Sequence, residues 1–282
     1  MPDMKETGNN REQKIAKLKP IVLDSLKKTF ANNEEVANSL EKIFEPLSKK
    51  PSFVPDRATL ELGLRFLHEA DRDIKSCKLL NSKSFYPHAV YHLQQASEKL
   101  VKAYVLQEGY FNATELHKQL MNHQTPLILI NATLIKTGFK AIAMLTKDPT
   151  LQKIIDVERT IKDENKRIEI ARISQSEIRQ LQGQIEEYRQ MGYSFEKLFN
   201  QGLSDSGLGV GPISIPAALS GLGTMLILAL ITFPHEAYTR YPDGKMKPDD
   251  YTTKLGIVSE MPRLTLLLEK EISNLEIMCT PK

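Results

Sequence analysis

The sequence is poor in the residues that cross-link small proteins or bind structural metals. It contains only two cysteines among 282 residues, Cys77 and Cys279. Two cysteines are too few for a disulfide framework or a zinc knuckle. Glycine and proline, with 14 and 15 residues, exclude the fibrous classes. The net charge of +3, from 38 basic and 35 acidic residues, is too small to indicate nucleic-acid binding by the field of the whole chain.

The first twenty residues lack the apolar stretch that a secretory signal requires. Together with the scarcity of cysteine, this absence favours a cytoplasmic protein in a reducing compartment. Hydrophobic residues make up 41% of the chain and charged residues 26%. These proportions are typical of a folded chain that is long enough to bury a sizeable core.

Apolar residues recur at helical spacing along most of the chain, and no segment shows the alternation that is typical of a strand. The first long helix is expected over residues 57–80, and the second over 87–109, ending at a glycine C-cap. Residues 116–145 are expected to be helical and apolar again. A last helix is expected over residues 249–278, with a kink at Pro262.

Four segments follow from these patterns. Residues 1–50 are expected to form an N-terminal helical appendage, and residues 57–146 the first part of a helical bundle. Residues 147–205 are expected to form a charged helical insertion, because their apolar residues follow the narrow spacing of a coiled-coil arm. Residues 206–282 would complete the bundle.

The stretch 206–234 contains no charged residue, and two interpretations of it stay open. Its continuous apolar part, residues 217–233, is at the short limit for crossing a membrane. The flanking charges show little positive-inside asymmetry, which favours a buried central helix. The alternative is a helical protein that is attached to a membrane through residues 217–233.

One block of sequence resembles a known family. The segment 88–111 resembles the second helix of HEPN domains, and three other pieces of that family's pattern occur around it in the expected order. The pieces of the resemblance are Gln94-Gln95-Ala96, Glu98-Lys99 and Lys102-Ala103 in the helix itself, Glu69-Ala70 and Asp73 before it, Glu115-Leu116-His117 after it, and Arg240-Tyr241-Pro242-Asp243 before the last helix.

The resemblance implies an all-α fold: an up-and-down helical bundle of the HEPN type, with the inserted arm and the N-terminal appendage added to it. It also implies a homodimer, a nucleotidyltransferase-type partner protein, and a role in toxin–antitoxin or defence systems. Some HEPN proteins are metal-independent ribonucleases whose motif is an arginine followed a few residues later by a histidine. Arg240 stands at the place of that arginine, but no histidine follows it.

Ligand-binding candidates lie on the expected second helix. Gln95, Glu98, Lys99 and Lys102 place an amide, a carboxylate and two ammonium groups at helical spacing. Such a row can bind a phosphate or the edge of a base. It can equally pair within the bundle, with the lysine stems covering apolar surface. Both interpretations stay open.

A second group of candidates, Arg240, Tyr241 and Asp243, precedes the last helix. Asp243 can hold Arg240 in a bidentate pair, which either anchors a ligand or locks the last turn. Arg240, His117 and His235 are weak catalytic candidates, the two histidines as replacements for the missing one.

His88 and His92 are four residues apart, a spacing that can share a metal ion, but no third ligand accompanies them. No metal and no cofactor are therefore expected. The leading hypothesis is a dimeric binding module that takes a nucleotide or RNA at a face formed by Glu98, Lys99, Lys102 and Arg240. The alternative is a metal-independent RNA endonuclease with a degenerate Arg…His motif, so enzymatic activity stays open.

Overall fold

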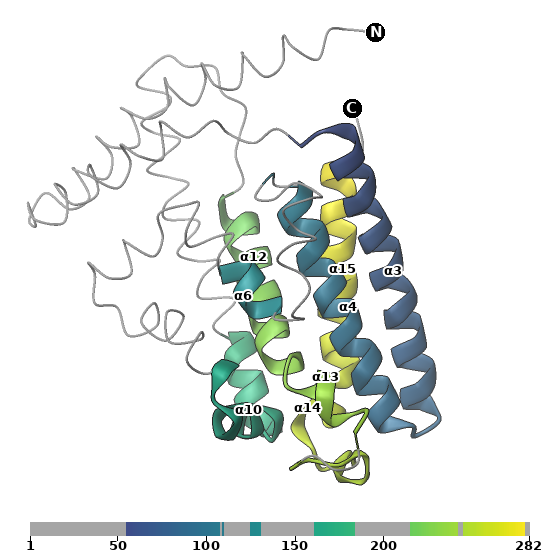
Figure 1. Cartoon of the computed structure of the whole chain (residues 1–282), viewed down its shortest axis with the longest axis vertical. Helices are drawn as coiled ribbons and strands as arrows, with labels where there is room; N and C mark the ends of the chain where they lie inside the picture. Colours follow the sequence, from purple (N-terminus) through teal and green to yellow (C-terminus); the bar gives the residue numbers. More distant parts are fainter. Residues whose placement is uncertain are drawn as a thin grey trace, which may run out of the picture.

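The computed structural model of the chain describes residues 55–107, 109, 125–130, 161–183, 215–241 and 245–279 (Figure 1). Helices and turns account for the regular structure within these ranges, and no strand occurs there. The all-α prediction is therefore confirmed. The N-terminal appendage predicted for residues 1–50 lies outside the described residues.

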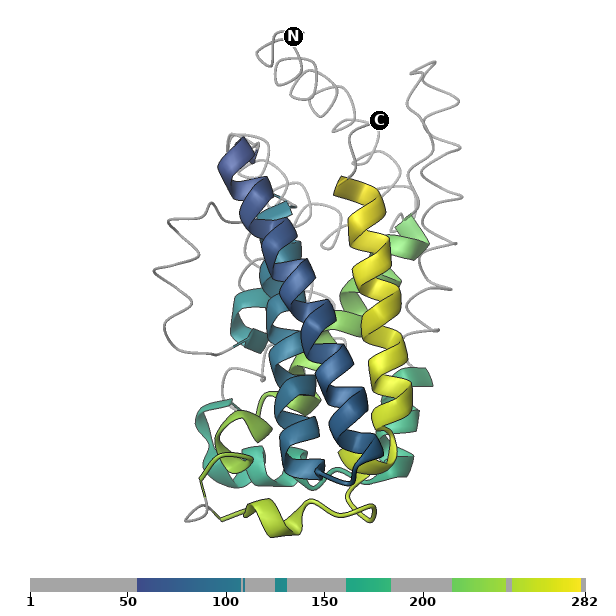
Figure 2. The ribbon, with the colours of Figure 1, turned by 90° about the vertical axis from the view of Figure 1, so that its right-hand side faces the viewer.

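The first two helices of the described residues form an antiparallel pair (Figure 2). Helix α3 spans Arg57–Ser82 and begins at Asp56, whose side chain accepts a hydrogen bond from the backbone N–H of Thr59. Helix α4 spans Tyr86–Gln107 and is followed by Gly109 at φ 67°, a left-handed conformation that favours glycine. Both helices and the glycine at the end of the second were predicted from the sequence.

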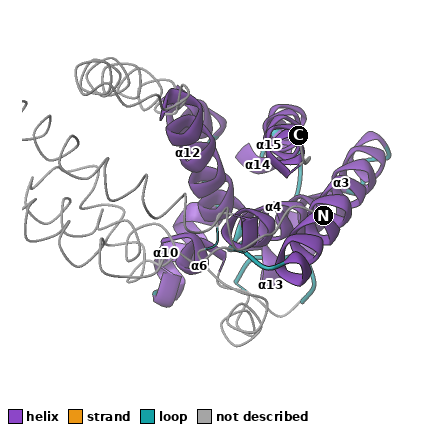
Figure 3. Cartoon of the chain, turned by 90° about the horizontal axis from the view of Figure 1, so that it is seen from above, coloured by secondary structure: helices purple, strands orange, loops and turns teal. Residues whose placement is uncertain are grey.

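Two further long helices complete the bundle around α4. Helix α15, Met261–Cys279, packs against α3 and α4, while α12, Ile215–Thr232, packs against α4 on another side (Figures 1 and 3). The short helix α6, Thr125–Ile130, contacts both α4 and α12. Fully buried large side chains from the long helices form one core: Leu67, Ile74, Leu93, Leu100, Leu106, Leu228 and Ile231.

The prediction of one continuous helix over residues 249–278 is wrong. This part of the chain forms the 3₁₀ turn η2, Pro248–Asp250, then the short helix α14, Gly256–Ser259, and finally α15. Pro262 therefore lies in the first turn of α15, where its missing N–H has no intrahelical partner to lose. A proline at this place begins a helix and does not kink it.

Residues 161–183, the described part of the predicted charged insertion, lie against the bundle. Helix α10, Glu164–Ala171, begins at Asp163, and a second helical stretch, residues 175–183, begins at a capping box between Ser174 and Glu177. The turn between the two stretches explains why the apolar spacing in the sequence changes there. The buried side chains of Ile161 and Ile178 fix this segment to the rest of the chain.

Most of the apolar stretch 217–233 lies within α12, which contacts α4, α6, α10 and α15. None of the helices in the described ranges has the length and apolar character that crossing a membrane demands.

Candidate functional site

A carboxylate joins α3 to α4 through two basic side chains. Asp73 on α3 lies with one oxygen 2.8 Å from Nδ1 of His92 and the other 2.5 Å from Nζ of Lys99, both on α4. These three residues are called the Asp73 cluster below. The side chain of Asp73 is 12% exposed, whereas those of His92 and Lys99 are 29% and 23% exposed. The cluster therefore lies at the edge of the helix pair, where solvent reaches it.

The charge state of Asp73 follows from its partners. Burial alone would raise the pKa of this carboxyl, but the hydrogen bonds from His92 and Lys99 and the charge of Lys99 hold the pKa below its usual range. Asp73 is therefore ionised at neutral pH. An ionised carboxylate only accepts hydrogen bonds, so Nδ1 of His92 carries the proton that it donates.

Arg240 lies near the same stretch of α4, just after the short helix α13, His235–Tyr238. Its guanidinium carbon is 5.7 Å from the centre of the Tyr91 ring on α4 and 5.5 Å from the centre of the Tyr241 ring. The guanidinium also pairs with the carboxylate of Glu236, one turn earlier. Arg240 and Tyr241 are both exposed, the latter at 55%. A guanidinium between two aromatic rings is held in place while part of it faces solvent.

The two groups meet through neighbouring rings. Tyr91 contacts His92 edge to face, with ring centres 5.6 Å apart, and the same tyrosine contacts Arg240. Tyr91, His92, Lys99, Arg240 and Tyr241 are called the α4 face below. This surface combines two aromatic rings with three basic side chains.

Two of the predicted ligand-binding residues lie in the core. Glu98 and Lys102 are only 3% and 9% exposed, they pair with each other, and Lys102 lies over the ring of Phe66 on α3. Because it is buried against Phe66, Lys102 does not share the exposed surface of Arg240. Gln95 is half-buried and donates to the side-chain oxygen of Gln94. Of the predicted second-helix residues, only Lys99 reaches the α4 face.

The histidine proposed to replace the missing catalytic one is buried. His235 is 0% exposed, and its Nδ1 lies 2.7 Å from the hydroxyl of Tyr251. Burial lowers the pKa of His235 to about 3, so the ring is neutral at physiological pH. A side chain in this position packs the core and does not reach a substrate. The other replacement candidate, His117, and the predicted partner Asp243 lie outside the described residues.

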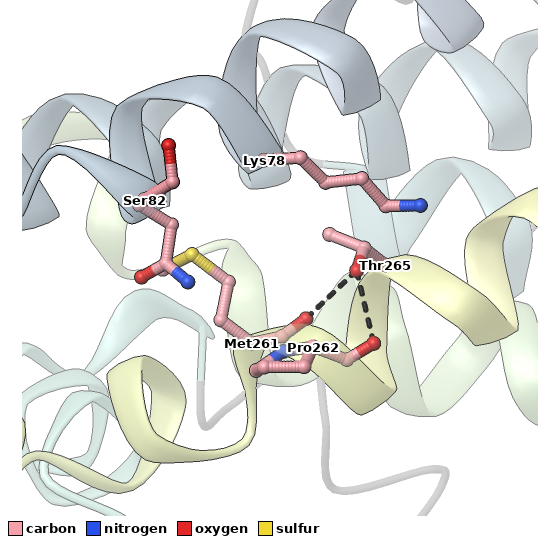
Figure 4. A pocket seen from close by; sticks show the side chains of 6 residues that line it. Lys78, Ser82, Met261, Pro262 and Thr265 are labelled. Carbon is pink, nitrogen blue, oxygen red and sulfur yellow. Dashed lines mark hydrogen bonds between the residues drawn. The ribbon is translucent and has the colours of Figure 1, made fainter.

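A surface hollow of about 340 Å³ lies elsewhere, between the end of α3 and the start of α15 (Figure 4). Its lining is Lys78, Asn81, Ser82, Met261, Pro262 and Thr265. The hydroxyl of Thr265 is already bonded to the carbonyls of Met261 and Pro262, one turn earlier in the same helix. None of the predicted site residues lines this hollow. In the described ranges, no group of three or more metal-ligating side chains could hold a metal ion.

Sequence reasoning missed the roles of Asp73, Tyr91 and His92 in this arrangement. Asp73 occupies a buried position of α3 between Ala70 and Cys77, both 0% exposed. An acidic residue on the apolar face of a helix was the available signal, because such a group needs a partner from a neighbouring element. The identity of that partner was not readable from spacing along one helix.

Comparisons with known proteins bear on the same helices. The family model of the HEPN domain matches residues 64–138, which include most of α3 and all of α4. The Arg240–Tyr241 part of the α4 face lies outside that match. Neither the search of curated proteins nor the search of solved structures found a match.

Proposed function

Because this chain carries a HEPN domain over residues 64–138, we propose that it is a homodimeric binding module that holds a nucleotide or RNA on the α4 face. The observation that carries the proposal is the guanidinium of Arg240 between the rings of Tyr91 and Tyr241. Proteins that bind single-stranded RNA combine exposed aromatic rings, on which bases stack, with arginine side chains that contact phosphates.

The α4 face has both kinds of group: the guanidinium carbon of Arg240 lies 5.7 Å and 5.5 Å from the centres of the Tyr91 and Tyr241 rings. Tyr241 is exposed enough to take a base. Arg240 pairs with Glu236, and a planar guanidinium has five N–H donors, so further donors remain for a phosphate oxygen. Basic side chains at one small patch also fit a chain whose net charge is only +3. A local patch, and not the field of the whole protein, would then provide the affinity.

The α4 face replaces the binding face that the sequence suggested. Glu98 and Lys102 pair in the core, so they support the bundle and leave Arg240, Lys99 and the two tyrosines as ligand contacts. Dimer formation, a nucleotidyltransferase-type partner and a toxin–antitoxin context are further parts of the proposal, supported by the family match. HEPN domains commonly pair with one another.

Fluorescence anisotropy with a labelled single-stranded RNA tests the proposal. Arg240→Ala should weaken binding about tenfold, the effect of losing one charged hydrogen-bonding group. Arg57→Ala is the matched control, because Arg57 is exposed and pairs with Glu61 four residues away, as Arg240 does with Glu236. The control should bind as tightly as the unchanged protein.

The same samples separate the alternatives. Light scattering should give the mass of two chains, and a monomer would contradict the dimer. Equal affinity of the Arg240→Ala and Arg57→Ala proteins would remove Arg240 from the binding site. Gel electrophoresis of the RNA after incubation reports cleavage. Fragments that disappear with Arg240→Ala would favour the endonuclease hypothesis over a binding module.

A further inference from the structure

An arginine of the predicted charged insertion has no partner for its charge. Arg167 lies on α10 and is half-buried, and its Nε atom is buried without a hydrogen-bond partner. Within the described ranges, the guanidinium of Arg167 forms no ion pair and no side-chain hydrogen bond. A guanidinium is always charged, and a buried donor that is left unpaired costs free energy. An anion that binds to this side chain would remove that cost.

Arg167 lies on the side of α10 that packs against the bundle. Residues three or four apart share one side of a helix, and Arg167 precedes Ala171 by four residues. Ala171 is 0% exposed. The same end of the bundle carries the short helix α13 (Figures 1 and 2). The guanidinium therefore lies between α10 and the bundle and not on the outer side of α10.

The hydroxyl of Tyr238, the last residue of α13, lies close to this guanidinium. The residue is 7% exposed, and burial raises the pKa of its hydroxyl. The positive charges of Arg167 and Lys245 oppose this rise, whereas the negative charge of Glu164 adds to it. All three charged groups therefore act on the hydroxyl from nearby. Because its pKa is raised, the hydroxyl is protonated at neutral pH and can donate a hydrogen bond.

Lys245 reaches α10 from the segment that follows α13. Its Nζ lies 3.3 Å from a carboxylate oxygen of Glu164 and 3.3 Å from Oδ1 of Asn165, both at the start of α10. The guanidinium of Arg172 donates to the backbone carbonyl of Lys245 at 3.5 Å. The side chain of Lys245 is 52% exposed, and an ammonium has three donors. It can therefore keep both contacts and still donate to a further acceptor that enters from solvent.

Positive charge is in excess at this place. Arg167 and Lys245 carry two positive charges, and within the described ranges Glu164 is the only carboxylate that pairs with either of them. An anion would balance the second charge. A phosphate suits the three donors better than a carboxylate does, because it has enough oxygens for a guanidinium, an ammonium and a hydroxyl at once.

We propose that Arg167, Tyr238 and Lys245 form a phosphate-binding site between α10 and the end of α13, called the α10 site below. None of these residues belongs to the α4 face, so the inference does not depend on the proposed function. It also gives the predicted insertion a role, since α10 provides one of the three groups that hold the ligand.

Isothermal titration calorimetry of the full-length protein with sodium phosphate, at pH 7.5 and constant ionic strength, tests the site. Arg167→Met should weaken binding about tenfold, the loss expected for a charged hydrogen bond. Tyr238→Phe, which removes one neutral hydrogen bond, should weaken it about fivefold. Lys166→Met is the matched control, because it removes the same charge at the next, exposed position of α10 and should bind as tightly as the unchanged protein.

Thermal unfolding separates a binding role from a structural one. In chloride buffer without phosphate, Arg167→Met should be at least as stable as the unchanged protein, because methionine fills the space of the arginine stem without burying an unpaired charge. Phosphate should then raise the unfolding midpoint of the unchanged protein and of Lys166→Met more than that of Arg167→Met. A large loss of stability of Arg167→Met in chloride would show that Arg167 supports the fold, and would overturn the inference.

Two competitors identify the source of the phosphate. Displacement of inorganic phosphate by AMP would assign the α10 site to a free nucleotide. Displacement by an RNA strand with hydroxyl groups at both ends would assign it to a nucleic-acid backbone. If Arg167→Met bound phosphate as tightly as Lys166→Met, or if the unchanged protein bound none at millimolar concentration, the inference would fail. The effect of Arg167→Met should persist in an Arg240→Ala background, so this result and that of the proposed function stay separate.

Discussion

Two carboxylates in this protein each join separate parts of the chain, but the two connections have different roles. Asp73 joins α3 to α4, which are neighbours in sequence and already share core residues along their length. Glu260 accepts hydrogen bonds from Gln175 and Arg179 and so joins the end of α14 to the charged insertion, about eighty residues earlier in the chain.

The second of these places is called the α14 junction below and comprises Gly256, Glu260 and residues 173–179. Here the backbones approach so closely that a Cβ on Gly256 would lie 2.2 Å from the carbonyl oxygen of Ile173. Glu260 is 2% exposed. Burial raises the pKa of its carboxyl, but the hydrogen bonds from Arg179 and Gln175 offset this and hold the pKa below its usual range. These contacts attach residues 173–179 to the end of α14.

The comparison shows which polar groups are available for function. The apolar core already holds α3 against α4, so the Asp73 cluster is not needed to keep them together. The junction has to hold a segment that shares less of the core. We therefore expect changes at the junction to lower stability and changes at the α4 face to lower RNA binding.

The largest expected effect at neutral pH is that of Gly256→Ala. The added methyl group has no room beside the backbone of residues 173–175, and overpacking of this kind costs about 1–3 kcal/mol. Urea unfolding followed by circular dichroism measures the loss. Gly183→Ala is the control, because a Cβ there meets nothing within 4 Å, and it should stabilise the helical stretch by roughly 0.5–1 kcal/mol. Equal stability of the two variants would contradict the close contact at the junction.

The next effect concerns the buried histidine of α13. His235 stays neutral in the folded protein until about pH 3, whereas an unfolded chain protonates it near pH 6.5. The unfolded state binds more protons between these values, so stability falls as the pH is lowered. The slope of the free energy of unfolding against pH in this window is about 1.4 kcal/mol per pH unit for one such group. His235→Gln should remove this contribution to the slope.

Urea titrations at several pH values between 7 and 4 measure this slope. His88→Gln, which replaces an exposed histidine, should leave the slope nearly unchanged. If both variants had the slope of the unchanged protein, His235 would not be the buried neutral group that the fold indicates. A loss of slope in His235→Gln alone would sharpen the contrast between a histidine of the core and His92 on the α4 face.

The smallest effect on stability is expected from Asp73→Asn. The cluster is partly exposed, and pairs of this kind contribute about 1 kcal/mol or less. Because the folded protein lowers the pKa of Asp73, its contribution is present above the unfolded value of about 3.9 and is lost as the pH falls through the lower folded value. The variant should therefore be less stable at pH 7 and should approach the unchanged protein as the pH falls through the lowered pKa of the folded state.

Unfolding curves at pH 7 and under acidic conditions measure that difference. A loss larger than that of Gly256→Ala would reverse the comparison and make the Asp73 cluster a main support of the bundle. A difference that stays the same in acid would show that the carboxylate charge does not contribute.

Much of the fold was predictable because helices depend on local patterns. The boundaries of α3 and α4 follow from apolar spacing, from a turn and from a glycine at the C-terminus, all within a few residues of one another. The last helix was predicted too long, since apolar spacing continued through η2 and α14 and did not reveal the breaks. The Ser174–Glu177 capping box would have indicated the break in the insertion, and it is readable from the sequence.

The site was only partly predictable. Lys99, Arg240 and Tyr241 were named from the sequence and lie on the α4 face, but Glu98 and Lys102 lie in the core. Spacing along one helix shows which residues lie on the same side of that helix. It does not say whether that side faces solvent or another helix, and the partners of Asp73 and of Arg240 come from other elements.

The sequence by itself determined the all-α class, the helices α3 and α4 and the match of residues 64–138 to the HEPN family model, because helix periodicity and a block of residue types are local properties. Only the tertiary structure decided which polar residues reach solvent. It buried His235, Glu98 and Lys102, and it brought Arg240 to Tyr91, about 150 positions earlier in the chain. Contacts between distant segments depend on how whole helices pack, and packing is a property of the assembled core.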